Sequence, residues 1–179
     1  LGLGVAFAGI VDYRLGVVAM SSVLPEMNFP LLEKLKSLPF PVVIENNANA
    51  AAIGLKWNGN DKTKKNYVIV LVEIDQSVSG LGIGIVIDGE LYRGSSFCAG
   101  ELYPHLATLK EILSSIRSRF VESEVLKNYM SSFDSIDIGI LLEAAKQGDE
   151  VAKLVFSMIG NMVGQTIAPA VALLNPDTL

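Results

Sequence analysis

The chain has 179 residues and a formal net charge of −5, with 50% hydrophobic and 18% charged residues. This composition supplies a sizeable core and excludes extensive disorder. Because the basic residues do not gather into a stripe, we do not expect the chain itself to bind nucleic acid. Cys98, the single cysteine, excludes an internal disulfide framework and a multi-thiolate zinc cluster, so we expect a reduced, cytoplasmic protein.

The first third of the chain predicts short strands and two helices. Strands are expected at residues 3–11, 17–20 and 42–44, and helices at 30–38 and 48–57. Asn46 or Asn47 is placed to cap the second helix, because asparagine favours the position before a first helical turn. The polar run 57–66 is the clearest loop and the expected boundary between two parts of the chain.

The rest of the chain predicts three strands followed by helices. The strands are expected at 67–73, 80–87 and 90–92, and the helices at about 107–120, 122–130, 137–147 and 149–174. Asp88-Gly89 between the last two strands is a strong signal for a two-residue hairpin turn. Strands that precede helices in each half, with one antiparallel hairpin, predict an α/β fold with a mixed sheet.

An uncharged stretch, residues 154–176, covers most of the last expected helix and is long enough to span a bilayer. Ser157, Asn161 and Gln165 recur every fourth residue and form one polar stripe. We therefore favour a buried core helix over a membrane span and expect no membrane association.

A glycine run, Gly80, Gly82 and Gly84, is the first candidate site. Glycines let a backbone approach a phosphate closely and leave its N–H groups available. However, this run lies inside a predicted strand, unlike a dinucleotide-binding fingerprint, which opens a helix. Relief of crowding in a twisted strand is therefore the alternative interpretation.

Two polar groups form the second and third candidates. Glu101 and His105 could together hold vicinal hydroxyls, although a surface glutamate and a loop histidine would look the same in the sequence. Asn46 and Asn47 are either a helix cap or two amides that hold the hydroxyls of a polar ligand.

Five segments, taken together, resemble the ordered motifs of the ROK family, which comprises repressors, uncharacterised reading frames and sugar kinases. They are GVAFAGIVD (residues 4–12), PVVIENNANAAAIG (41–54), GLGIGIVIDGELYRGSSFCAGE (80–101), AAKQGDEVA (144–152) and LLNP (173–176). The resemblance covers nearly the whole chain, in the family's order.

The resemblance implies an actin-like ATPase fold, with two ribonuclease H-like lobes, a mixed sheet with helices, and a ligand cleft between the lobes. Residues 1–56 would end the first lobe, 57–66 would form a loop, and 67–179 would form most of the second lobe. The family's first phosphate loop and its adenosine-binding glycines would lie outside the chain, so we expect a fragment of a longer protein.

The chain departs from the family's kinases at two positions. The aspartate that takes a proton from the sugar hydroxyl in those kinases corresponds to Asn47, and an amide can hold a hydroxyl without activating it. Loss of a general base typically costs roughly 10²–10⁴-fold in rate. The Gly-Thr that helps to cradle the ATP phosphate corresponds to Val78-Ser79, which leaves Ser79, Gly80 and Gly82 as a phosphate-loop remnant.

A third departure concerns zinc. The family places its histidine three residues after the glutamate, whereas here Pro104 takes that place and His105 follows it. The family's zinc site combines this histidine with a cysteine cluster, and those cysteines are missing from this chain. We therefore expect no zinc and no other metal.

These features predict the sugar-sensing domain of a ROK-type transcriptional regulator. It would bind a monosaccharide in the interlobe cleft through Asn46, Asn47, Glu101 and His105, without efficient phosphoryl transfer and without a catalytic residue. We expect a homodimer that contacts DNA only through a domain absent from this chain. The alternatives are an ATP- and Mg²⁺-dependent sugar kinase, similar to glucokinase or N-acetyl-hexosamine kinases, and a degenerate domain that serves assembly.

Overall fold

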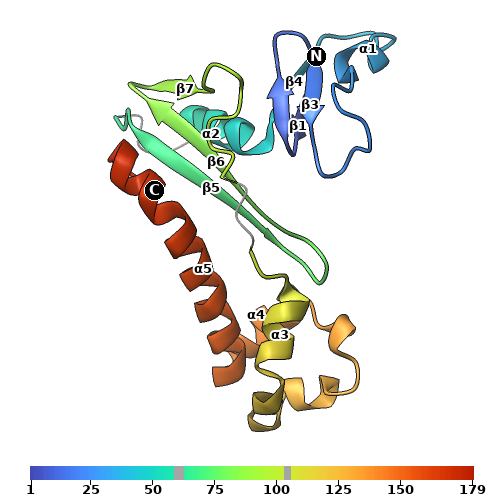
Figure 1. Ribbon diagram of the computed structural model, residues 1–179, viewed down its shortest axis with the longest axis vertical. Coiled ribbons are helices and arrows are strands. Elements are labelled where there is room, and N and C mark those ends of the chain that lie inside the picture. Colours follow the sequence, from blue (N-terminus) through green and yellow to red (C-terminus); the bar gives the residue numbers. More distant parts are fainter. Residues whose placement is uncertain (59–62, 103–105) are drawn as a thin grey trace. The chain divides into compact units, whose positions relative to one another are not determined.

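The computed structural model describes residues 1–58, 63–102 and 106–179, and Figure 1 follows its elements along the chain. The strands are β1 (Leu3–Phe7), β2 (Ile10–Asp12), β3 (Val17–Met20), β4 (Val42–Asn46), β5 (Tyr67–Ile74), β6 (Ser79–Ile87) and β7 (Glu90–Tyr92). The α-helices are α1 (Leu31–Lys34), α2 (Asn47–Asn58), α3 (Leu109–Ser115), α4 (Ile138–Lys146) and α5 (Glu150–Leu174), with short 3₁₀ helices η1 (Arg117–Glu122), η2 (Leu126–Tyr129) and η3 (Phe133–Ser135).

The described residues form two compact units. Unit 1 contains residues 1–58, 63–71, 82–102 and 175–179. Unit 2 contains residues 72–81 and 106–174. Unit 1 therefore holds parts of both lobes expected from the sequence, and the division into lobes stays a prediction.

Unit 1 contains a parallel and an antiparallel strand pair. β1 pairs in parallel with β4, and β2 pairs antiparallel with β3. The strand expected over residues 3–11 is wrong in one respect, because it breaks at Gly9 into β1 and β2. Gly9 has a φ of 124°, and a Cβ atom there would lie 2.2 Å from the carbonyl oxygen of Met20. Only glycine permits this approach at this φ.

The remaining strands form a three-stranded sheet in the order β5-β6-β7. β6 and β7 are antiparallel, and the turn between them has Asp88 and Gly89 at φ values of 52° and 79°. Two positive φ values are typical of a type I′ turn, which twists in the sense that a hairpin requires. The predicted hairpin is confirmed.

The helix predicted over residues 30–38 is shorter than expected. α1 ends at Lys34, and the chain continues as tight turns in which Lys36 N–H donates to Glu33 and Leu38 N–H donates to Leu35. Leu38 precedes Pro39, and a residue before proline is disfavoured in the helical region. A helix that runs through Leu38 is therefore disfavoured, and the regular α-helix gives way to turns before that point.

Unit 2 is built around a cluster of helices with its own core. The side chains that are fully buried there include Leu109, Leu113, Phe120, Leu126, Ile136 and Leu141. α3 begins with a capping box, in which Thr108 and Glu111 satisfy each other's backbone N–H groups. The helix predicted over 107–120 is thus replaced by α3 and the 3₁₀ helix η1.

The helix predicted over residues 122–130 is also wrong, because only the short η2 forms there. Ser123 is buried, and its hydroxyl accepts the N–H of Leu126 at 2.8 Å and donates to Asp149. A serine that caps a following turn starts a new helix rather than continuing an old one.

α5 confirms the last predicted helix, and most of its buried residues lie in its first turns, with Ile167 the exception further along. Val151, Ala152 and Val155 are buried in the core of unit 2. α5 is also long and apolar enough to cross a membrane, and only 11% of its most apolar window is buried, so most of it is not the buried core helix that the sequence predicted. With 25 residues it extends about 37 Å, whereas the 9 residues of α4 extend about 13 Å, so its neighbour is too short to cover it.

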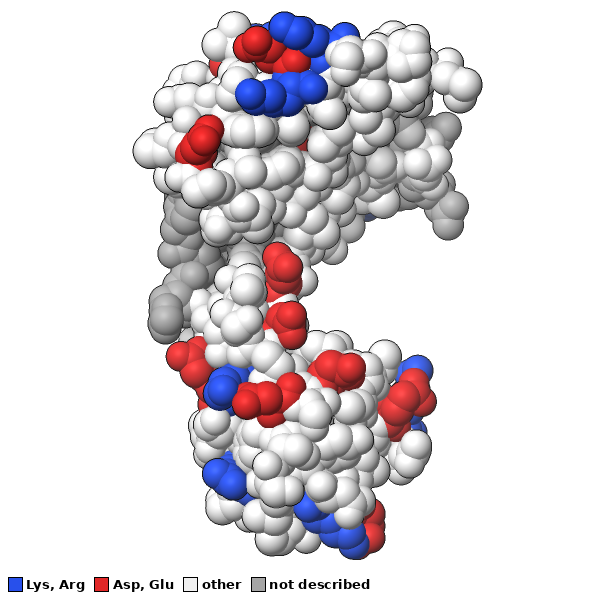
Figure 2. Space-filling view, turned by 90° about the vertical axis from the view of Figure 1, so that its right-hand side faces the viewer, with Lys and Arg blue, Asp and Glu red and all other residues white. Residues whose placement is uncertain are grey.

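Charged side chains of both signs are interspersed on the face shown in Figure 2. In unit 2 several of them form exposed pairs three residues apart, among them Arg119–Glu122, Lys146–Glu143 and Lys153–Glu150. The hydrogen bond from Arg119 holds the pKa of Glu122 below its ordinary value. Such pairs contribute little to stability, but they keep positive charge from accumulating on one surface.

Candidate functional site

Asn46 ends β4 at the point where α2 begins, and only 5% of its surface is exposed. Its Oδ1 accepts the N–H of Asn49 at 3.0 Å, which caps the helix. Its Nδ2 donates to the Gly9 carbonyl at 2.9 Å and to Glu101 Oε1 at 3.0 Å. The cap interpretation is confirmed for Asn46, and both of its amide hydrogens already have acceptors.

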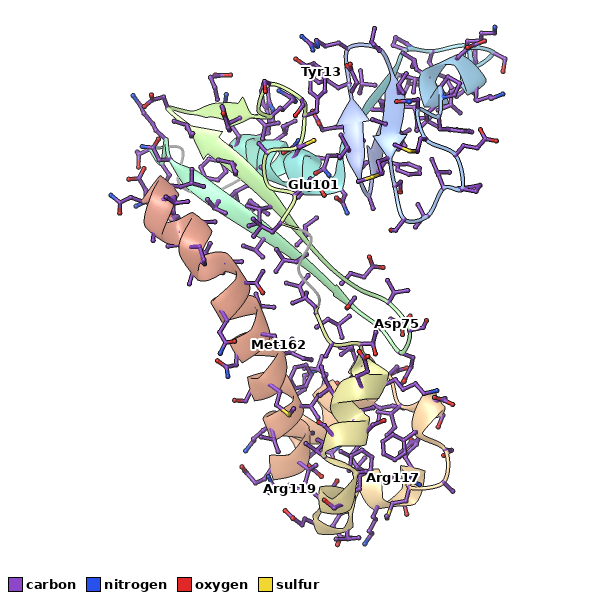
Figure 3. The ribbon with its side chains drawn as sticks, viewed as in Figure 1. Tyr13, Asp75, Glu101, Arg117, Arg119 and Met162 are labelled. Carbon is purple, nitrogen blue, oxygen red and sulfur yellow. The ribbon has the colours of Figure 1, made fainter. Side chains whose placement is uncertain are left out.

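Glu101 reaches this amide because of the glycine before it. Gly100 has a φ of 89°, and a Cβ atom there would lie 1.8 Å from the carbonyl oxygen of Ile83. The N–H of Ile83 donates to Gly100 at 3.2 Å, and Glu101 forms an isolated antiparallel bridge with Gly82. Figure 3 shows Glu101 beside the start of α2, where two segments far apart in the sequence meet.

Asn47 is the first residue of α2 and is half-buried. Its Oδ1 accepts the N–H of Ala48 at 2.9 Å and would lie 3.9 Å from a Cβ atom at Gly82. No bond from Asn47 Nδ2 is found within the described residues. Asn47 can therefore donate to a hydroxyl at the positive end of a helix dipole, but an amide cannot take up a proton at neutral pH.

The glycine run supports the packing of α2 on β6. A Cβ atom at Gly84 would lie 2.3 Å from the Ala48 carbonyl oxygen, and one at Gly82 would lie 3.2 Å from the Ala48 Cβ. Gly80 is different, because the nearest atom to its Cβ would be 4.0 Å away, in Glu73. Crowding therefore explains Gly84, while phosphate binding by Gly80 and Gly82 stays a prediction.

Ser79, the third residue of the predicted phosphate-loop remnant, has its hydroxyl engaged. Its Oγ donates to the Leu106 carbonyl at 2.6 Å. The neighbouring Val78 is 49% exposed and accepts the N–H of Asp75 in the turn between β5 and β6. A phosphate that needed the Ser79 proton would have to break the bond to Leu106.

His105 lies outside the described residues, so its predicted place beside Glu101 stays a prediction. Among the residues that are described, no group of three or more histidine, cysteine, aspartate or glutamate side chains could hold a metal ion. Cys98 is a free thiol of intermediate exposure. The absence of zinc, like the place of His105, stays a prediction.

Sequence reasoning missed an ion pair beside the site. Glu45 Oε2 accepts from Nε and Nη2 of Arg93 at 2.9 and 2.6 Å. Glu45 Oε1 accepts the N–H of Asn46 at 3.0 Å and Nδ2 of Asn49 at 3.3 Å. Glu45 opens the polar cluster in the sequence, but no local pattern connects it to a residue 48 positions away.

Comparison with known proteins decides the family. The ROK family model matches residues 1–108. The chain belongs to the ROK family. A xylose repressor from Caldicellulosiruptor bescii is 29% identical over 99% of this ROK chain and 48% of the repressor. The chain therefore spans about half the length of that relative.

Solved ROK structures share the fold. A glucokinase from Streptomyces griseus, in complex with glucose and AMPPNP, matches with a TM-score of 0.78 and 26% identity, over 97% of this chain and 62% of the glucokinase. A transcriptional regulator homologous to the E. coli MLC protein matches with a TM-score of 0.75 and 26% identity, over 97% and 47% of the two chains. The expected α/β, actin-like ATPase fold is confirmed, and the ROK relatives include both repressors and sugar kinases.

Proposed function

We propose that this ROK chain is the monosaccharide-sensing domain of a transcriptional regulator and does not transfer phosphoryl groups efficiently. The observation that carries the proposal is the amide of Asn47 at the start of α2, next to the Asn46–Glu101 bond. A kinase needs a group there that accepts a proton, whereas a sensor needs only one that holds a hydroxyl.

The chemistry of the site suits a sugar. A hydroxyl both donates and accepts, so it can donate to the Glu101 carboxylate and accept from Asn47 Nδ2. A carboxylate accepts several hydrogen bonds at once, and Asn46 can therefore hold Glu101 while a sugar binds. In this proposal Asn46 orients Glu101, and His105 adds a further contact.

Sensing requires a difference in sugar affinity between two conformations. A sugar that binds one arrangement more tightly shifts the population toward it, and DNA-binding domains outside this chain respond. Micromolar affinity, about 8 kcal/mol, is sufficient for such an effector. In this proposal the protein is a cytoplasmic homodimer that uses neither zinc nor ATP for sensing.

Calorimetry on the full-length protein tests the proposal. We expect D-xylose or D-glucose to release or absorb heat in a saturable titration, with no ADP formed when ATP and Mg²⁺ are added. If a panel of pentoses and hexoses gives no binding, the sensing proposal is wrong. Turnover of about 1–100 s⁻¹, as in kinases, would establish the enzyme instead.

The second candidate, a sugar kinase, is favoured by the match to the glucokinase complex and by the retained Gly80 and Gly82. Asn47→Asp in the full-length protein separates the two functions. If the phosphate site is intact, restoring a carboxylate should raise kinase activity by roughly 10²-fold or more, measured in a coupled ADP assay. Asn47→Ala is the matched control, since it removes the amide without adding a base. Activity that stays at background in Asn47→Asp would show that the phosphate site is lost as well.

A further inference from the structure

The segment from Arg93 to Glu101 is tied at both ends to consecutive residues of β4. Arg93 binds Glu45, and Glu101 accepts from Asn46. We propose that Arg93 is a positioning residue for the sugar site. Its ion pair with Glu45 keeps the Glu101 carboxylate in a fixed position relative to the start of α2. This inference rests on the proposed function.

The geometry of the ion pair suits this role. Two nitrogens of Arg93 donate to one oxygen of Glu45, and the side chains are only 23% and 13% exposed. A charge-assisted pair that is shielded from water is stronger and more directional than a pair on the surface. The other oxygen of Glu45 accepts from Asn46 and Asn49 at the helix start. Loss of Arg93 would therefore leave a shielded carboxylate unpaired beside Asn46.

The segment also holds a backbone conformation that depends on its contacts. Phe97 has a φ of 62°, in the left-handed region that a bulky side chain rarely adopts. Its ring packs edge-on against Tyr13 at 5.8 Å, and Arg93 in turn lies 4.1 Å from the centre of the Tyr13 ring. Figure 3 labels Tyr13, which lies in the turn between β2 and β3. Arg93 thus connects Glu45 with the ring that supports the strained residue.

The test compares Arg93→Met and Arg93→Lys with Lys56→Met in the full-length protein. Lys56 forms an exposed ion pair with Glu90 in the same unit, whereas Glu45 is paired with Arg93. We expect Arg93→Met to weaken the affinity for D-xylose or D-glucose by about tenfold or more, by analogy with the effect of removing groups that orient metal-ligating side chains. Arg93→Lys should restore part of the affinity, and Lys56→Met should leave it unchanged. Titration well below the melting temperature of each variant separates positioning from stability, since a purely structural role would lower Tm and leave the Kd as in the wild type.

A second measurement needs no sugar. Cys98 lies within the tied segment, so its alkylation by iodoacetamide, followed by mass spectrometry of the labelled peptide, reports how often the segment opens. We expect faster labelling in Arg93→Met than in the wild type and in Lys56→Met. A wild-type Kd in Arg93→Met would overturn the inference. If the wild type binds no sugar, the proposed function fails, and the role of Arg93 in a sugar site fails with it. Labelling rates then test the structural tie alone: faster labelling in Arg93→Met shows that Arg93 holds the segment, and equal rates overturn that role as well.

Discussion

The side-chain amide of Asn46 has both hydrogens and its oxygen committed, to Gly9, Glu101 and Asn49. Three segments of unit 1 therefore meet at one buried side chain. A buried polar group that is fully paired fixes the relative positions of its partners more sharply than apolar contacts do. This explains how a residue with no hydrogen left for a ligand can still determine where the Glu101 carboxylate, which we propose binds the sugar, lies.

Gly84 is the residue at which steric crowding can be tested directly. Gly84→Ala should lower the free energy of unfolding by about 1–3 kcal/mol, because the new methyl group would lie 2.3 Å from the backbone of Ala48, which cannot move without shifting α2. Urea denaturation measures the change. Gly54→Ala is the control: nothing lies within 4 Å of its Cβ position inside α2, and alanine there should stabilise the helix by about 0.5–1 kcal/mol. Equal effects of the two substitutions would contradict the packing argument.

The buried phenol of Tyr67 is expected to make the stability of the protein depend on pH in the alkaline range. Burial raises the pKa of its phenol above the ordinary value of 10.0, although Lys56 opposes the shift, and its hydroxyl donates to Ala52 at 2.9 Å. A raised pKa favours the neutral form in the folded state. The stabilisation that Tyr67 gives the folded state is therefore complete below about pH 10 and is lost as the pH rises through the pKa of Tyr67 in the folded protein.

Tyr67→Phe removes this titrating group. We expect the variant to be about 1 kcal/mol less stable at neutral pH and to lose less stability than the wild type above about pH 10. Urea unfolding from pH 7 to 11 measures both quantities. Parallel pH profiles for the two proteins would show that Tyr67 makes no such contribution.

Among the secondary-structure elements, η2 depends on one buried hydroxyl. Ser123→Ala should lower the free energy of unfolding by about 1–2 kcal/mol, since the N–H of Leu126 loses its cap and Asp149 loses a donor. Ser135→Ala is the matched control, because that serine is exposed and its hydroxyl donates to the nearby Ser132 carbonyl. We expect the control to stay within about 0.5 kcal/mol of the wild type. A similar loss in both variants would argue against the cap.

Secondary-structure elements were predicted correctly from the sequence where the residues that determine them are close together in the chain. The hairpin at Asp88-Gly89 was predictable because its turn residues determine their own φ angles. The helices expected over 30–38 and 122–130 were overestimated, because apolar spacing does not reveal that α1 ends at Lys34 or that Ser123, held by Asp149, caps a new turn. Periodicity reports which face could be buried, but it does not report where the neighbouring elements end.

For the molecule as a whole, three core clusters in the described part of the chain each lie within one unit: one in unit 2 and two in unit 1. Phe120→Ala should cost about 3–5 kcal/mol, and the loss of protection should concentrate in unit 2, where Phe120 is fully buried. Hydrogen exchange read by mass spectrometry measures protection segment by segment. Val18→Ala is the reciprocal variant, because Val18 is fully buried in unit 1. Equal loss of protection across both units in either variant would mean that the protein unfolds as one cooperative body.

Local order and family membership were readable from the chain alone. Strand and hairpin signals, the asparagine cap and the amide of Asn47 depend on residue types at fixed short spacings. The bond between Asn46 and Glu101 joins residues 55 positions apart, and the Arg93–Glu45 pair joins residues 48 positions apart. Such contacts arise only when packed strands bring distant segments together, because Coulomb and hydrogen-bond energies depend on separation in space and not on spacing along the chain.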